Sequence, residues 1–135
     1  MTSFPLRIVS PDGVEFDGMA EELIVRTTTG DIGIMAGHVN VVAPLGMGRA
    51  TVITEGSRRY AACIGGMVSV VNNQVTIVAT TFEWAEDIDL DRTNNALKYA
   101  QEQLKRKDQS KRDLQLAEAK LRRALVRKSV ATGNK

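Results

Sequence analysis

The sequence predicts an α+β chain, in which an antiparallel β-sandwich of about ten short strands precedes an antiparallel hairpin of two helices. Three observations support this prediction. Before residue 87, β-branched residues alternate with polar ones and turn residues recur about every 8–12 positions, a pattern typical of sandwiches and barrels. After Asp89 the apolar period changes from 2 to about 3.6. The net charge changes sign at the same place.

The strand-rich part contains no helical segment between its strands, which excludes a parallel α/β fold. Residues 20–28 predict a strand with Leu23 and Val25 on one face and Ile24 and Arg26 on the other. The single Cys63 lies in an alternating run, so we expect a small core residue. Short turns separate the strands, at residues 11–13, 30–31, 55–57 and 72–73. Glycines also interrupt the apolar runs, at residues 46, 48 and 65–66, and we interpret them as further strand ends.

The helical part begins with Asp89, whose carboxylate can accept from the unpaired N–H groups of a first helical turn. The polar segment 105–111 predicts the turn between the two helices. Because the apolar stripes are narrow, we expect the hairpin to be marginally stable alone and therefore mobile. The stripes consist of Leu97, Ala100 and Leu104 in the first helix and Leu114, Ala117, Leu121 and Ala124 in the second.

The change of pattern predicts a sandwich domain at residues 1–86 and a helical domain at 87–135. Residues 1–88 carry 5 Lys+Arg and 10 Asp+Glu, a balance of −5, and residues 89–135 carry 13 and 6, a balance of +7. No basic and apolar leader follows Met1, so no signal peptide is predicted. No apolar run approaches the length of a membrane span. The 4% aromatic content disfavours nucleic-acid binding.

Catalytic patterns are absent from the sequence, which predicts a non-enzymatic role. There is no phosphate loop of the Gly-x-x-x-x-Gly-Lys-Ser/Thr type, no plausible nucleophile–base set and no cluster of metal ligands. The only histidine, His38, has no second histidine or nucleophile nearby. We therefore expect a structural or interface histidine.

Several sequence blocks together resemble the epsilon subunits of bacterial F-type ATP synthases, the counterparts of the mitochondrial delta subunit. The Gly-Asp-Ile-Gly-Ile segment with its following Gly-His is rather specific to that family. The resemblance covers residues 5–130 in order and with the family's spacing. The blocks are residues 9–13, 29–38, 42–45, 65–66 and 85–89.

The resemblance implies a ten-stranded sandwich that binds the gamma subunit and the membrane c-ring in a central stalk. It implies a peripheral location on the cytoplasmic face of the bacterial cell membrane, without insertion into it. It also implies helices that either fold on the sandwich or extend towards the alpha/beta subunits, where extension inhibits ATP hydrolysis.

Carried over by position, the resemblance assigns the c-ring contact to Thr29, Gly30, Asp31 and Ile32, with Asp31 meeting the polar loops. The alternative is an ordinary glycine turn. His38 lies at a position close to gamma in the family. A basic face could meet an acidic segment of the beta subunit, or could simply be a solvated helix face. It comprises Lys120, Arg122, Arg123, Arg127 and Lys128.

Some family members bind one regulatory ATP, with or without Mg, on a motif Ile-Asp-x-x-Arg-Ala; no cofactor is otherwise required. Residues 88–93 keep Ile88, Asp89 and Arg92 but have Thr93 in the alanine place. Glu83 and Arg122 would complete such a site. Tyr99 and Val126 replace two arginines of ATP-binding relatives, which predicts weaker binding. The alternative to an ATP site is that Asp89 caps a helix and that Arg92 pairs with it or with Glu86. The alternative to the role in a central stalk is a freestanding ATP-binding switch.

Overall fold

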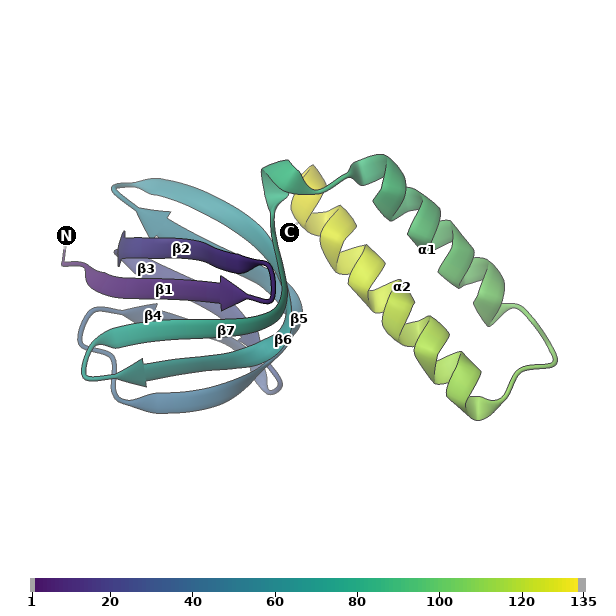
Figure 1. The fold of residues 1–135 in the computed structure, drawn as a ribbon, viewed down its shortest axis with the longest axis horizontal. Coiled ribbons are helices and arrows are strands. Elements are labelled where there is room, and N and C mark those ends of the chain that lie inside the picture. The colour runs from purple at the N-terminus through teal and green to yellow at the C-terminus, as the bar shows by residue number, and fades with distance from the viewer. Residues whose placement is uncertain (1, 134–135) are drawn as a thin grey trace. The chain divides into compact units, whose positions relative to one another are not determined.

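A computed structural model describes residues 2–133 and divides the chain into two compact units between Trp84 and Ala85 (Figure 1). The sequence prediction places this boundary two residues later, at 86/87. Each unit is described by itself. The first contains β1 (Phe4–Ser10), β2 (Gly13–Ala20), β3 (Glu22–Thr27), β4 (Gly30–Met35), β5 (Val41–Thr54), β6 (Ser57–Val71) and β7 (Gln74–Trp84). The second contains a 3₁₀ turn, η1 (Ala85–Asp87), and the helices α1 (Leu90–Leu104) and α2 (Lys111–Thr132).

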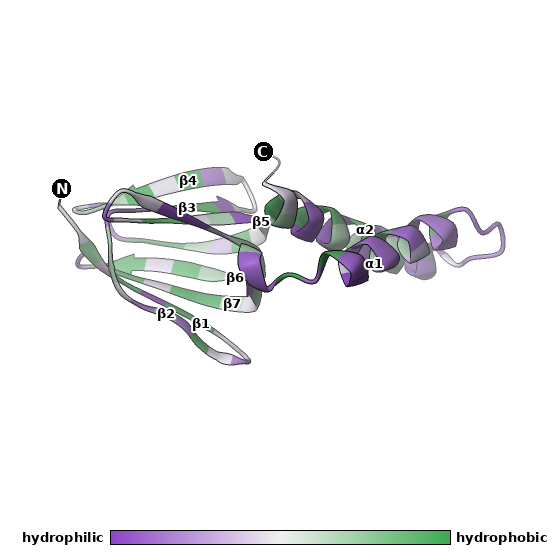
Figure 2. Ribbon diagram, turned by 90° about the horizontal axis from the view of Figure 1, so that it is seen from above, coloured by the Kyte–Doolittle hydropathy of each residue, from purple (hydrophilic) through white to green (hydrophobic). Residues whose placement is uncertain are grey.

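The first unit is one seven-stranded sheet in the order β2-β1-β7-β6-β5-β3-β4. Neighbouring strands are antiparallel except β1 and β7, which are parallel. Figure 2 shows that the sheet curls so that β3 and β4 lie over β1, β2 and β7. The result is a two-layered sandwich, as the sequence predicts.

The predicted number of about ten strands is wrong, because glycines that the sequence analysis treats as strand ends lie inside continuous strands. β5 runs through Gly46 and Gly48, and β6 runs through Gly65 and Gly66. At Gly66, φ is +118° and an added Cβ would lie 2.1 Å from the carbonyl oxygen of Val78 on β7. Glycine there permits a close approach of two backbones rather than a turn.

Alternation along the strands produces the core between the layers. Leu23 and Val25 are fully buried, whereas Ile24 is half-buried and Arg26 is exposed, which confirms the predicted faces of this strand. Cys63 is 4% exposed and is a core residue as predicted. Its burial raises the pKa of the thiol from 9.0 to about 12, because a thiolate is poorly solvated there.

The second unit is a helical hairpin whose ends are capped by side chains. The Asp89 carboxylate accepts from the backbone N–H of Arg92 at 3.0 Å, and Ser110 accepts from that of Asp113 at 3.1 Å. The predicted cap at Asp89 is thus confirmed. Between the helices, the Gln109 side-chain amide donates to the carbonyl of Arg106 at 3.1 Å.

The seam of the hairpin follows the predicted stripes. Its buried residues include Leu97 and Ala100 on α1 and Ala117 and Ala124 on α2. Thr93 is buried as well, with its hydroxyl donating to the Asp89 carbonyl at 2.8 Å. The remaining members, Leu104, Leu114 and Leu121, are half-buried.

Candidate functional site

The β3–β4 hairpin carries the residues assigned to the c-ring contact. Thr29 and Asp31 are exposed, and Gly30 and Ile32 are half-buried. The buried Thr27 hydroxyl holds the turn: it donates to the Gly30 carbonyl at 2.7 Å and accepts from the Thr29 backbone N–H at 3.2 Å. This local closure stiffens the loop and leaves its polar tip in solvent.

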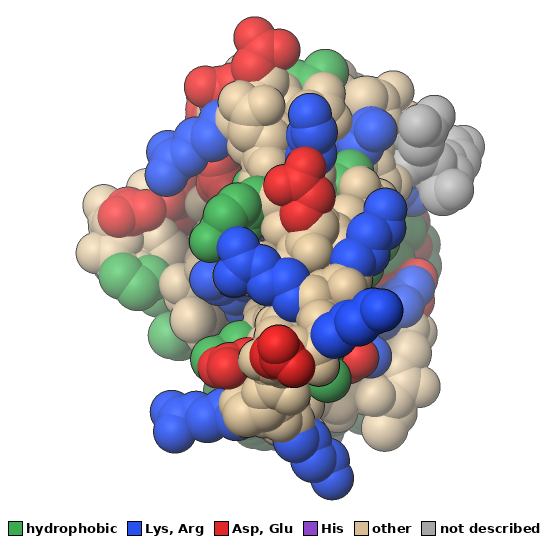
Figure 3. Space-filling model, turned by 90° about the vertical axis from the view of Figure 1, so that its right-hand side faces the viewer, with side chains coloured by type: hydrophobic (Ala, Val, Ile, Leu, Met, Phe, Trp, Pro, Cys, Tyr) green, Lys and Arg blue, Asp and Glu red, His purple; other side chains and the backbone are tan. Residues whose placement is uncertain are grey.

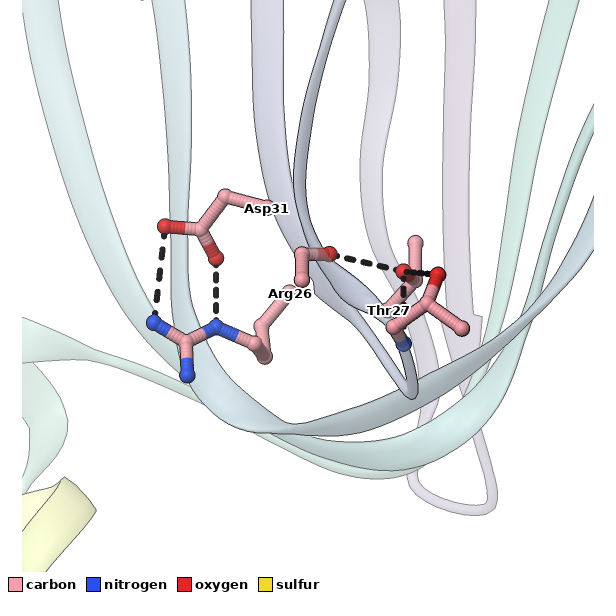
Figure 4. A network of polar contacts seen from close by, with 5 residues as sticks. Arg26, Thr27 and Asp31 are labelled. Atoms are coloured by element: carbon pink, nitrogen blue, oxygen red, sulfur yellow. Dashed lines mark hydrogen bonds and ion pairs between the residues drawn. The ribbon is translucent and has the colours of Figure 1, made fainter.

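Asp31 is not alone at this tip. The Nε of Arg26 donates to its Oδ1 at 2.5 Å, and Nη2 donates to its Oδ2 at 3.5 Å (Figure 4). The hydrogen bond to Asp31 and the negative charge of that carboxylate raise the pKa of the Arg26 guanidinium. The tip therefore presents a charge-compensated pair rather than a lone anion.

The loop at residues 36–40 contains His38, which is half-buried. Its Nδ1 lies 2.7 Å from the Val39 carbonyl, and its backbone N–H donates to the Met35 carbonyl at 3.1 Å. The loop is fastened to the β6–β7 turn. The Gly37 N–H donates to the Asn73 side chain, and the Asn72 N–H donates to the Asn40 side chain, both at 2.8 Å.

Next to this loop, the outward side of β5, β6 and β7 carries several exposed apolar side chains. Pro44 and Val78 are the two register partners of Met67 across the neighbouring strands. Val42 is 63% exposed, Met67 43% and Val78 54%. We name this region the outer apolar surface; it consists of Val42, Pro44, Met67, Val71 and Val78.

Exposed apolar side chains gathered on one face of a sheet are a feature of interaction sites in soluble proteins. The sequence analysis missed this surface, although the alternation that buries Val75, Ile77 and Ala79 leaves Val78 on the solvent side. It also missed Arg26 as the partner of Asp31. The signal was available there too, because opposite charges flank a short turn between two predicted strands.

Three of the candidate nucleotide residues share the start of one helix. Ile88, Asp89 and Arg92 lie together at the start of α1, where the Asp89 carboxylate acts as the helix cap. Arg122 is exposed on α2, and Glu83 belongs to β7 of the sandwich unit. Tyr99 is exposed and Val126 is half-buried, so neither position supplies a cation for phosphate.

The basic residues of α2 divide between two sides of the helix. At 3.6 residues per turn, Lys120, Arg123 and Arg127 follow one another at i, i+3 and i+7. Arg122 lies on the other side, and Lys128 lies between the two sides. Figure 3 shows Lys and Arg side chains spread over one side of the molecule, with fewer Asp and Glu among them.

Residues 2–133 contain no group of three His, Cys, Asp or Glu side chains that could hold a metal ion. Over the same residues, none of the helices combines the length and the apolar character needed to cross a membrane.

Comparison with protein families gives two adjoining matches. Residues 3–85 match the family described as ATP synthase, Delta/Epsilon chain, beta-sandwich domain, and residues 86–132 match its long alpha-helix domain. The ATP synthase epsilon chain of Bacillus velezensis is 41% identical over 132 residues, and that of Ruminococcus albus 38% over 132; each match covers 97% of this chain and 98% of the relative.

Among solved structures, the fold is similar to a chain of the Euglena gracilis mitochondrial ATP synthase, with a TM-score of 0.80 and 22% identity over 90% of this chain and 77% of that one. It is also similar to a chain of the Tetrahymena thermophila mitochondrial ATP synthase, with a TM-score of 0.62 and 12% identity over 94% and 95%. These likenesses support the fold. The family matches and the identities to bacterial relatives confirm the resemblance read from the sequence: the chain belongs to the ATP synthase delta/epsilon chain family.

Proposed function

We propose that the chain is the epsilon subunit of the central stalk of a bacterial F-type ATP synthase, without catalytic activity of its own. In this role the sandwich links the gamma subunit to the c-ring at the cytoplasmic face of the membrane. The hairpin restrains ATP hydrolysis by reaching the alpha/beta subunits. The observation that carries the proposal is the outer apolar surface, which a protein partner would cover.

The gamma subunit is the partner that this surface fits. The loop of His38 is hydrogen-bonded to the turn that follows Val71, so this loop lies beside one end of the outer apolar surface. An interface with an apolar centre and polar groups at its rim has this composition.

A pair of substitutions tests the gamma contact. Met67→Glu places a charge in the centre of the outer apolar surface, and Met19→Glu makes the same change on β2, at a methionine of similar exposure. We expect Met67→Glu to weaken binding to purified gamma by roughly tenfold or more, the cost of an unpaired charge at an interface. Met19→Glu should bind as the unmodified chain does. Equal affinities of the two variants would exclude this surface.

The basic stripe of Lys120, Arg123 and Arg127 supports the proposed approach of the hairpin to an acidic segment of the beta subunit. Complementary charge of this kind steers and orients a partner more than it adds affinity. The inhibition of hydrolysis should therefore weaken as the salt concentration rises.

We propose weak binding of one ATP at the start of α1, because Asp89 and Arg92 are adjacent there while Tyr99 and Val126 withhold two cations. Calorimetry of the full chain with MgATP tests this, with saturation expected only in the range of about 1 mM. Asp89→Asn is the control variant for this measurement. It keeps the helix cap, because asparagine caps a helix as well as aspartate does, and it removes only the negative charge of residue 89. No heat at millimolar nucleotide would remove the ATP site. Nucleotide binding without binding to gamma or the c-ring would favour a freestanding switch.

A further inference from the structure

The proposed c-ring contact has a second residue at its centre, Arg26. Arg26 and Asp31 are register partners across the β3–β4 hairpin, so their side chains leave the same face of the ribbon. Two guanidinium nitrogens engage the two carboxylate oxygens, and the third nitrogen is directed away from Asp31 (Figure 4). Arg26 thus fixes the carboxylate and keeps donors of its own available.

The backbone beside Arg26 is shaped around its side chain. The register between β3 and β5 shifts between Ile24 and Thr27. Ile24 pairs with Thr51 and Thr27 pairs with Leu45, so β5 advances by six residues where β3 advances by three. Gly48 lies in this extra length. A Cβ at Gly48 would be 2.5 Å from the Cβ of Arg26 and 2.9 Å from its Cγ. Any residue other than glycine at position 48 would clash with the aliphatic part of the Arg26 side chain. In the position that Gly48 permits, this side chain extends so that its guanidinium reaches Asp31.

Stability alone does not explain this arrangement. The side chains of Arg26 and Asp31 are 51% and 54% exposed, and ion pairs so exposed to water contribute little to folding. The turn is already closed by the Thr27 hydroxyl. The pair instead fixes the orientation of the Asp31 carboxylate, because an aspartate that accepts from two guanidinium N–H groups is held in one orientation.

We propose that Arg26 is the positioning residue for Asp31 in the contact with the c-ring, an inference that rests on the proposed function. The pair forms a donor–acceptor head that is neutral overall. It fits a polar loop that offers a cationic or amide donor to Asp31 and a backbone carbonyl to the outward nitrogen of Arg26. A lone carboxylate would instead favour any cationic surface, so the pair narrows the choice of partner.

Three variants of the full chain separate positioning from simple strand pairing. Arg26→Gln removes the charge and the forked donors, and Arg26→Lys keeps the charge without the fork. The exchange Arg26→Asp with Asp31→Arg keeps an ion pair across the strands but reverses its direction. Arg58→Gln is the matched control: Arg58 is exposed on β6, and its side chain has no ion-pair partner among residues 2–133.

The measurement is the affinity of each variant, in its complex with gamma, for the detergent-solubilised c-ring of the same bacterium. Binding to gamma and the near-ultraviolet spectrum of Trp84 report folding. We expect Arg26→Gln and the exchanged pair to bind the c-ring roughly tenfold more weakly, the loss of one charge-assisted hydrogen bond. Arg26→Lys should recover part of this loss, and Arg58→Gln should bind as the unmodified chain does.

The outcomes distinguish the inference from the function on which it rests. If the unmodified complex binds the c-ring no better than gamma alone, the c-ring contact itself is wrong, and the positioning role falls with it. If the unmodified complex binds and Arg26→Gln or the exchanged pair binds equally well, the contact stands and the role of Arg26 is overturned.

Discussion

The indole Nε1–H of Trp84 donates to the backbone carbonyl of Glu15 at 3.3 Å, which ties the last residue of β7 to β2. The Trp84 ring lies edge-on to Phe82 with centroids 5.0 Å apart, and the Arg59 guanidinium lies 3.7 Å from the indole centroid. These contacts all belong to the sandwich unit. They explain why the sandwich unit extends to Trp84 and the second unit begins at Ala85.

The first prediction concerns this tryptophan, the only one in the chain. A shortened chain of residues 1–86 should keep the emission maximum of buried Trp84, because its contacts above do not involve the hairpin. Phe16→Ala, which removes a ring 6.4 Å away, should shift the emission to longer wavelength by admitting water. Fluorescence spectra of the three proteins check this. A red shift on removing the hairpin alone would contradict the assignment of Trp84 to the sandwich.

The second prediction compares two glycines with positive φ, Gly66 and Gly56. A neighbouring strand lies against Gly66, whereas the space around Gly56 is open. Gly66→Ala should destabilise the sandwich by more than the about 1–2 kcal/mol that a left-handed conformation costs alone, because its Cβ would meet the backbone of Val78 and Ala79. Gly56→Ala should cost only the conformational part, since no atom lies within 4 Å of its added Cβ. Denaturant unfolding measures both. Equal losses would contradict the close approach of β6 and β7.

The third prediction concerns the cap of α1. Asp89→Ala should lower the stability of the hairpin by about 0.5–2 kcal/mol, because an N–H of the first turn loses its acceptor. Asp89→Asn should change it by only a few tenths, since the amide oxygen still accepts. Helical circular dichroism during thermal unfolding is the measurement. An asparagine variant as unstable as the alanine variant would indicate that charge, not capping, is the contribution of Asp89.

The fourth prediction concerns pH. Because burial raises the pKa of Cys63 to about 12, the folded state holds the thiol proton more tightly than the unfolded chain does. The corresponding stability is complete below pH 9 and is lost as the pH rises towards 12, by at most about 1.4 kcal/mol per pH unit. Unfolding free energies of the unmodified chain and of Cys63→Ala, measured across this range, should show a shallower slope for the variant. Parallel slopes would contradict burial of the thiol.

Local patterns predicted those parts of the structure that depend on sequence neighbours. The alternation around Leu23 and Val25, the capping carboxylate of Asp89 and the seam through Leu97 and Ala117 each follow from a period or a capping rule. The sandwich and the two-helix hairpin follow from these patterns taken together.

Features that depend on contacts between distant residues could not be predicted in this way. Gly46 and Gly66 have the residue type expected of a turn at a strand end, yet they lie inside long strands. At both positions the backbone of a neighbouring strand lies close to the glycine, and this contact cannot be predicted from the adjacent sequence. The union of Val42, Met67 and Val78 into one surface likewise requires the register of three strands. Arg26 differs from these residues, because its pairing partner Asp31 is only five positions away in the sequence. Its close approach to Gly48 does depend on a distant part of the chain.

The most direct test of the regulatory role is ATP hydrolysis by the reconstituted complex, with either the full chain or residues 1–86 in place. The shortened chain keeps the outer apolar surface and the Arg26–Asp31 pair, so it should still assemble with gamma and the c-ring. Without the hairpin, hydrolysis should be faster than with the full chain. An unchanged rate in a complex shown to contain the shortened chain would contradict restraint by the hairpin.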